Sequence, residues 1–417
     1  MFQTKQRLPK KQANPKNGAS ATPIQRKIGF EFEVGDWEVF KVKEGAEDLA
    51  RDRNHPECRL PLAHKDVILS GEGFGMTGDA SPGFTDIEYV TEPFEETDEG
   101  LERLRKTMAG ITASATALHH LAQENPSELV RASSLGQYGD VKLPNSLIDA
   151  TTPPLMKPQL TAGVGLRHIP DLLRLTGLSA REDEKTKSEL SLFRKTLIDH
   201  KPGMHPLLKE EAYVSHHTTA FCASSLENIL STPPSPELVA LASLIRVYIL
   251  SAIRMPFYYP KSALAIMART DFAQMFRLLP PQEQEALKAE NASLFVKAME
   301  NCLPFINLNS PIFENGVRKE QKEAPNKTLE RPLKKEWIRN IPLGVDLLTQ
   351  KYFPMPEKAS ELDTIGSWHE RTELLTDGTS APIFELRRMA NAETIEEWGA
   401  IAEMAFEAIR SLKRDKK

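Results

Sequence analysis

Cysteine is scarce in this chain of 417 residues, which contains only three, at positions 58, 222 and 302. They are too few and too scattered for a disulfide framework or a zinc site. Their number fits a reducing compartment. Long apolar runs are also missing. The most apolar stretch, Val239 to Ile253, is short and contains Arg246, so we expect a buried helix there and no membrane span.

An excess of positive charge is missing as well. The formal net charge is −5 and the pI is about 6.1, so the whole chain has no nucleic-acid footprint. The N-terminus has no apolar region of the kind found in Sec-type signal peptides. With 40% hydrophobic and 27% charged residues, the composition is that of a soluble globular protein. The length suits two or three average domains, or one large enzyme domain with an inserted subdomain.

The start of the chain differs from the rest. The first 27 residues contain seven Lys or Arg and no acid, with Pro, Gln, Asn, Gly and Ser between them. Such a segment buries too little apolar surface to order itself, so we predict that residues 1–26 are disordered. A basic tail without a specific role is the simpler interpretation. The alternatives are a loading signal or a contact with an acidic surface.

Apolar periodicity places the predicted strands towards the two ends of the chain and the helices between them. Strands are expected at residues 27–42, 66–69, 84–91, 160–166 and 381–389. Helices are expected at residues 100–123, 181–199, 236–254, 271–279, 281–301 and 393–413. Residues 71–78 and 315–340 are expected to be loops. The pattern predicts an α+β fold in which residues 27–417 form a mixed or antiparallel sheet with a helical insertion at about residues 171–302.

Two carboxylates stand two residues apart in the first strand. Glu31 and Glu33 lie in the apolar run from Ile28 to Val34. Because alternate residues of a strand point to the same face, both acids project from one side. Their mutual repulsion must be compensated. A divalent cation is one candidate, and solvent exposure is the other.

Later strands repeat this pattern of alternating acids. Glu88 shares a face with Asp86, and Glu385 shares one with Arg387. Hard cations such as Mg²⁺ prefer oxygen ligands and bridge carboxylates to substrate phosphates, while an arginine can clamp a phosphate. For each strand taken singly, the alternation of apolar and polar residues on a half-solvated strand is a sufficient explanation. For the strands together, a functional acidic face and simple alternation remain equally open.

Four short motifs follow one another along the chain, namely Gly29–Glu33, Asp79–Ser81, Glu88–Pro93 and Pro158–Thr161. In this order they resemble the amidoligase family of carboxylate–amine ligases, which are akin to glutamine synthetase and glutamate–cysteine ligase. In addition, Phe384–Arg387 resembles the late Glu-x-Arg strand of that superfamily. The motifs are short and spread over most of the chain. The helical middle has no counterpart that aligns motif by motif.

The resemblance implies a glutamine synthetase-like catalytic sheet that uses ATP and Mg²⁺. ATP would phosphorylate a substrate carboxylate, and an amine would displace the phosphate to leave an amide. The implied metal ligands are Glu31, Glu33, Glu88 and Glu385. The implied phosphate contacts are Arg387, Lys261 and Arg269. Gln159 and Thr161 stand on the nucleotide side, where relatives often carry histidines.

The junction Pro23–Gly29 also resembles bacterial toxin-like proteins that carry such a domain after a delivery segment. This resemblance implies an effector made in the bacterial cytoplasm, with residues 1–26 as a loading signal for an export or contractile injection machine. The implied partners are a carboxylate and an amine, each from a small molecule, a peptide or a protein. The alternative is a non-catalytic effector or protein-binding module on the same fold.

Overall fold

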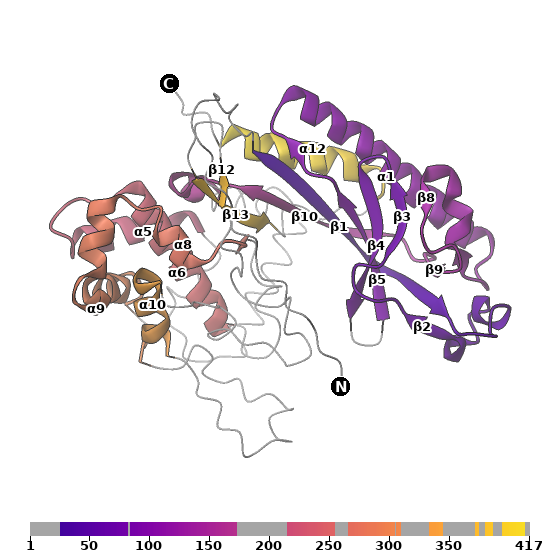
Figure 1. The fold of residues 1–417 in the computed structure, drawn as a ribbon, viewed down its shortest axis with the longest axis horizontal. Helices are drawn as coiled ribbons and strands as arrows, with labels where there is room; N and C mark the ends of the chain where they lie inside the picture. Colours follow the sequence, from indigo (N-terminus) through magenta and orange to yellow (C-terminus); the bar gives the residue numbers. More distant parts are fainter. Residues whose placement is uncertain are drawn as a thin grey trace, which may run out of the picture.

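The computed structural model describes residues 26–81, 84–172, 215–254, 266–304, 306–309, 333–344, 372–374, 380–386 and 394–412. The predicted helix at 181–199 and most of the predicted loop at 315–340 lie outside these ranges. The described part consists of an antiparallel sheet with two long helices against it and a lobe of helices beyond one edge (Figure 1).

The sheet is built around one long strand, β1 (Lys27–Val42), which lies between β10 (Leu155–Gly163) and β5 (Phe84–Thr91). The sheet continues past β10 with β13 (Ser380–Leu386) and then β11 (Ile266–Ala268). Past β5 it continues with β4 (Phe74–Ser81), β3 (Val67–Gly71) and β8 (Asp140–Val141). The remaining strands are β2 (Arg59–Pro61), β6 (Phe94–Glu95), β7 (Val130–Arg131), β9 (Leu147–Asp149) and β12 (Thr372–Leu374). Every pair among the described strands is antiparallel, which confirms the predicted α+β class. The glutamine synthetase-like type stays a prediction.

One face of the sheet is apolar and is covered by helices α1 (Asp98–Glu124) and α12 (Glu397–Ser411) (Figure 1). From Ile28 to Val34 the even-numbered residues, which include Phe30 and Phe32, are buried, while the odd-numbered residues between them are half-buried. On the same apolar face, the ring of Tyr89 meets Trp398 of α12 edge-on, with centroids 6.0 Å apart. The helices therefore fix which face of β1 is covered, and they leave Glu31 and Glu33 on the other face.

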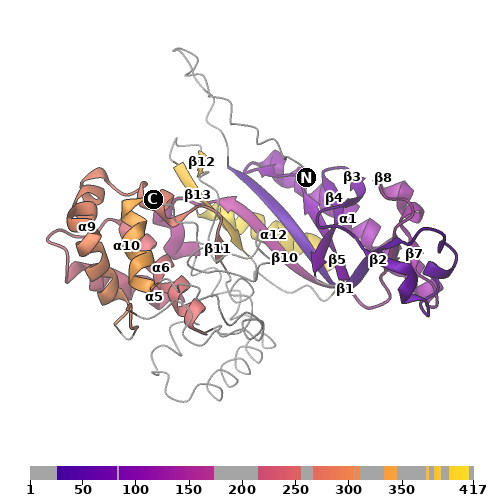
Figure 2. The ribbon, with the colours of Figure 1, turned by 60° about the horizontal axis from the view of Figure 1, so that its bottom comes forward.

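The helical lobe lies at the β11 end of the sheet (Figures 1 and 2). It comprises α5 (Ser215–Glu227), α6 (Pro236–Arg254), α8 (Phe272–Phe276), α9 (Pro281–Cys302) and α10 (Lys334–Leu343). The last of these begins inside the stretch predicted as a loop, and β11 lies inside the predicted helical insertion. Short 3₁₀ turns are η1 (Leu49–Arg51), η2 (Pro56–Cys58), η3 (Ala132–Tyr138) and η4 (Leu166–His168). None of the described helices is both long and apolar enough to cross a membrane.

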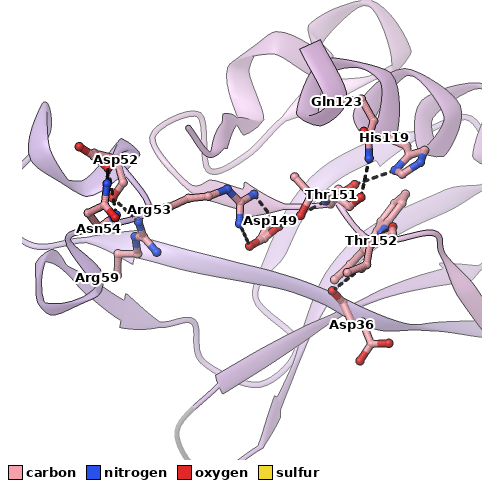
Figure 3. Close-up of polar contacts among 12 residues, drawn as sticks. Asp36, Asp52, Arg53, Asn54, Arg59, His119, Gln123, Asp149, Thr151 and Thr152 are labelled. Atoms are coloured by element: carbon pink, nitrogen blue, oxygen red, sulfur yellow. Dashed lines mark hydrogen bonds and ion pairs between the residues drawn. The ribbon is translucent and has the colours of Figure 1, made fainter. Parts of the chain in front are cut away.

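The segment before β10 is held from three sides (Figure 3). Arg53 Nη2 donates to Asp149 Oδ1 at 2.7 Å, and His119 Nδ1 of α1 donates to the carbonyl oxygen of Ala150 at 2.7 Å. Thr152 Oγ1 donates to the carbonyl oxygen of Asp36 in β1 at 3.0 Å. These contacts hold the segment that leads into β10 against α1 and β1.

Two strands differ from their predicted bounds. Residues 71–78 were expected to form a loop because of their glycines, but most of them belong to β4, and only the turn at Gly73 has a positive φ, of 79°. Gly78 is needed inside the strand, since a Cβ there would stand 2.6 Å from Thr85 Cγ2. Strand β10 also starts earlier than predicted and includes Pro158. Proline is tolerated there because β13 pairs with β10 only from Leu160 onward.

Arg26, which the sequence places in the basic segment 1–26, belongs to the folded core. Its side chain is 1% exposed and forms two bonds to Glu96, from Nε to Oε2 at 2.7 Å and from Nη2 to Oε1 at 2.6 Å. The guanidinium also donates to the carbonyl oxygens of Gly163 at 3.1 Å and of Ile409 at 2.8 Å. It therefore joins the start of β1 to the end of β10 and to α12. The basic composition of residues 1–26 predicted disorder and gave no sign of this structural role for Arg26.

Replacing Arg26 by methionine is expected to destabilise the protein by roughly 3–5 kcal/mol, because the buried Glu96 carboxylate loses both of its hydrogen bonds to the guanidinium. Urea unfolding of the full chain measures this. The control is Lys27→Met, since Lys27 and Glu95 form an exposed pair at 3.8 Å, which is worth about 1 kcal/mol or less. Equal losses in the two variants would contradict the structural role of Arg26.

Candidate functional site

The acids of β1 and β5 meet on the sheet face opposite α1 and α12. Glu33 is the direct cross-strand partner of Glu88, and Glu31 is the partner of Val90. Directly opposed residues of an antiparallel pair share a face, with Cβ atoms roughly 4.5–5.5 Å apart. Glu88 is 2% exposed, although it lies on the face away from the apolar core. Glu31 and Glu33 share one face as predicted, and the pairing of β5 with β1 brings Glu88 to that face. Their role as metal ligands stays a prediction.

Strand β10 places Gln159 and Thr161 beside these acids. Gln159 is the cross-strand partner of Glu31, and its Nε2 lies 3.4 Å from Glu33 Oε2. Thr161 stands opposite Gly29. A Cβ added to Gly29 would meet no atom of the described residues within 4 Å, so these residues leave open space over the sheet at this point. A ligand placed there would lie between the acidic pair and Thr161.

Glu385 of β13 extends the same face, because it is the partner of Thr161. Its side chain is buried and forms an ion pair with Arg269, whose backbone N–H donates to the carbonyl oxygen of Ile383 at 2.7 Å. The sequence assigned Glu385 to a metal and Arg269 to a phosphate, and the structure brings these two residues together. The other two predicted phosphate contacts, Lys261 and Arg387, lie outside the described residues.

Lys65 is a site residue that the sequence reasoning missed. Its ammonium forms an ion pair with Glu88 and lies 4.0 Å from Glu31 Oε2. Thr77 of β4, opposite Glu88 in the sheet, places its Oγ1 3.4 Å from Glu88 Oε2. The contact between Lys65 and Glu88 spans 23 residues and depends on a turn. Alternation within one strand cannot reveal it.

Burial dominates the ionisation of Glu88. Loss of solvent, followed by the negative charge of Glu31, raises the pKa of Glu88 to about 8, although the ammonium of Lys65 acts in the opposite direction. Burial by itself would lower the pKa of Lys65, but the attraction of Glu88 and then of Glu31 raises it. The ammonium therefore stays charged at neutral pH, and Glu88 is the group whose ionisation is costly.

A further row of acids lies next to this site. Asp79 of β4 is opposite Asp86 of β5, which is opposite Glu38 of β1. His64 Nδ1 lies 3.0 Å from Asp79 Oδ1. Burial, with a further contribution from Asp149, raises the pKa of Glu38. The acidic face therefore extends along the sheet beyond Glu88, and it includes the Asp79–Ser81 motif.

The donor atoms of this face are of the type that a hard divalent cation prefers. Three carboxylates project from neighbouring ladder positions, and oxygen is the ligand atom that Mg²⁺ and Mn²⁺ prefer. Within the part of the chain that the structure describes, no three Asp, Glu, His or Cys side chains lie in positions that would hold a metal ion. The positive charge beside Glu88 and Glu31 is instead the Lys65 ammonium.

No protein-family model matches the chain, and no curated protein matches it. Among solved structures, it is similar to a mutant of a VgrG Vibrio cholerae toxin ACD domain in complex with ADP and Mn²⁺. The alignment covers 93% of this chain and 99% of that one, at 14% sequence identity and a TM-score of 0.31. At that score the likeness carries no argument about fold or function.

Glu88→Gln is expected to change how stability depends on pH. Between the ordinary carboxyl value of 4.5 and about 8, folded Glu88 holds a proton that the unfolded chain releases. The free energy of unfolding therefore falls as pH rises through this range. A glutamine at this position does not titrate, so the free energy of unfolding of Glu88→Gln should not fall in this way. Relative to wild type, it should rise by roughly 1–3 kcal/mol between about pH 5 and pH 8. Urea unfolding at several pH values measures the difference, with Glu33→Gln as the half-buried control. Parallel profiles for wild type and Glu88→Gln would contradict it.

Proposed function

We propose that this chain is an ATP- and divalent-metal-dependent carboxylate–amine ligase. The observation that carries the proposal is the cross-strand arrangement of Glu33 and Glu88, with Glu31 two residues along the same face of an antiparallel sheet. The ordered motifs that resemble the amidoligase family contain these same residues. Open space above Gly29, beside the acids, is where a substrate would reach them.

The residues of the face have distinct parts in this proposal. Glu31, Glu33 and Glu88 would hold the divalent cation, which when bound screens the nucleotide phosphates and stabilises phosphoryl transfer. Gln159 orients the Glu33 carboxylate through its side-chain amide, which lies 3.4 Å away. Arg269 neutralises buried Glu385, so the charge at the β13 side of the face is compensated without a metal.

The proposed reaction has two steps. The γ-phosphoryl group of ATP passes to a substrate carboxylate oxygen, which gives ADP and an acyl phosphate. The amine nitrogen then attacks the acyl carbon, phosphate leaves with the bonding electrons, and the nitrogen loses a proton to form the amide. The acid and the amine are each part of a small molecule, a peptide or a protein.

Delivery as an effector is part of the same proposal. It rests on the basic composition of residues 1–25 and on the resemblance of the Pro23–Gly29 junction. Arg26 itself belongs to the folded part in this proposal, because its guanidinium is bonded to Glu96.

Glu31→Gln and Glu88→Gln are each expected to lower Mg²⁺-dependent ATP consumption by about 100-fold or more, because each removes a charged oxygen ligand from the cation. ADP release in the presence of candidate acids and amines measures this, and circular dichroism checks that the fold is kept. The control is Glu57→Gln, an exposed acid on η2. Full activity in both site variants would remove the metal assignment. A wild-type protein that binds a partner but consumes no ATP would favour the non-catalytic module.

Filling the space above Gly29 is expected to block nucleotide binding while the fold is kept. Gly29→Leu should cost about 1 kcal/mol or less in stability, because no atom of the described residues lies within 4 Å of the added Cβ. Titration with an ATP analogue and Mg²⁺ should show at least a tenfold weaker affinity. Gly136→Leu is the matched control, since Gly136 on η3 also has no atom within 4 Å. Unchanged nucleotide affinity in Gly29→Leu would place the ligand elsewhere.

A further inference from the structure

The acidic face carries its own positive charge beside the carboxylates proposed to bind metal. The Lys65 ammonium forms an ion pair with Glu88 and lies 4.0 Å from Glu31 Oε2. A divalent cation held by Glu31 and Glu88 would occupy the same few ångströms. Two cations about 4 Å apart repel strongly where water is partly excluded. Lysine and metal therefore compete for these two carboxylates.

The backbone of Lys65 is fixed at the site. The residue has a φ of 63°, and its N–H donates to the carbonyl oxygen of Gly78 at 2.7 Å. The N–H of Gly78 in turn donates to the carbonyl oxygen of Asp66 at 3.1 Å, so the turn and β4 hold each other. Lys41 and Asp66 form an ion pair at 2.7 Å on the same turn. These contacts thus hold the Cα atom of Lys65, from which the side chain starts, next to the acids.

The two partners of the ion pair differ in their freedom to move. The Glu88 side chain is 3% exposed and belongs to a central strand, whereas the Lys65 side chain is 42% exposed. A lysine has a flexible four-carbon stem, and its ammonium is readily hydrated. The ammonium can therefore leave Glu88 for solvent or for an anionic ligand, while the carboxylate stays in place.

We propose that Lys65 is an internal counter-ion that occupies the place of the divalent cation between Glu88 and Glu31, and that it leaves Glu88 when the cation binds. This inference rests on the proposed function for its assignment of Glu31 and Glu88 to a metal. It adds that Lys65 sets the affinity of the site for the cation. It also adds that metal binding frees an ammonium at the edge of the site.

The test measures binding of Mn²⁺ alone to the full chain at neutral pH, by calorimetry and by the electron paramagnetic resonance signal of free Mn²⁺. Lys65→Met should bind Mn²⁺ at least tenfold more tightly than wild type, since the competing charge is gone. Lys65→Arg keeps the charge and should bind as weakly as wild type. Lys106→Met removes an exposed lysine paired with Glu72 and should have no effect. Equal or weaker Mn²⁺ binding by folded Lys65→Met would overturn the proposal.

A second measurement on the wild-type protein does not depend on the folding of a variant. Saturating Mn²⁺ should increase the rate at which an amine-specific reagent labels Lys65 several-fold, as read by mass spectrometry against Lys106. An unchanged or lower labelling rate at Lys65 would overturn the proposal.

Neither readout uses ATP, so failure of the inference and failure of the proposed function are distinguishable. Tighter Mn²⁺ binding by Lys65→Met without any ATP consumption would support the counter-ion and reject the ligase. ATP consumption that depends on Glu31 and Glu88, with Mn²⁺ affinity unaffected by Lys65→Met, would reject the counter-ion alone.

Discussion

The burial of the Glu88 carboxylate beside other acids is the constraint on which one whole face of the sheet depends. A carboxylate with 2% exposure has lost most of its water, and it is tolerated only with a proton or with a cation in contact. When Glu88 is ionised, the ammonium of Lys65 is the cation in contact with it, and burial still raises the pKa of Glu88 to about 8. A row of acids can stand here because one neighbour supplies the compensating charge.

The opposite face holds this arrangement in register. Phe30 and Phe32 are buried under α1 and α12, and a slip of β1 by one residue would exchange the apolar and acidic faces. The bulge between Val34 and Glu38 determines which residues lie on each face further along the strand. Three residues of β1, 35–37, are extra opposite the single step from Ile87 to Asp86, and Asp36 among them has a φ of 66°, so that Trp37 is buried and Glu38 stays on the acidic face. Core packing thus determines where the acids stand.

Alternation within a single strand was enough to predict the shared face of Glu31 and Glu33, because side-chain direction in a strand is set locally. Glu88 joins them only through the pairing of β5 with β1. Two other residues depended on contacts that no local pattern contains. Lys65 reaches Glu88 only because the turn before β3 is bonded to β4. Arg26 lies in a basic, polar stretch, and its burial requires Glu96, β10 and α12 together. Residues whose role depends on partners far along the chain therefore could not be predicted from the sequence.

Two cation–acid pairs lie on the acidic face, and they differ in how firmly the cation is held. Arg269 follows β11 directly, its backbone is bonded to β13, and its guanidinium can fork onto a carboxylate, which suits a permanent partner for Glu385. Lys65 has a fixed backbone in a turn but a half-exposed side chain ending in a hydrated point charge. The arginine pair is therefore suited to neutralise Glu385 permanently. The lysine pair is suited to exchange, and it lies beside the three carboxylates that share the centre of the sheet.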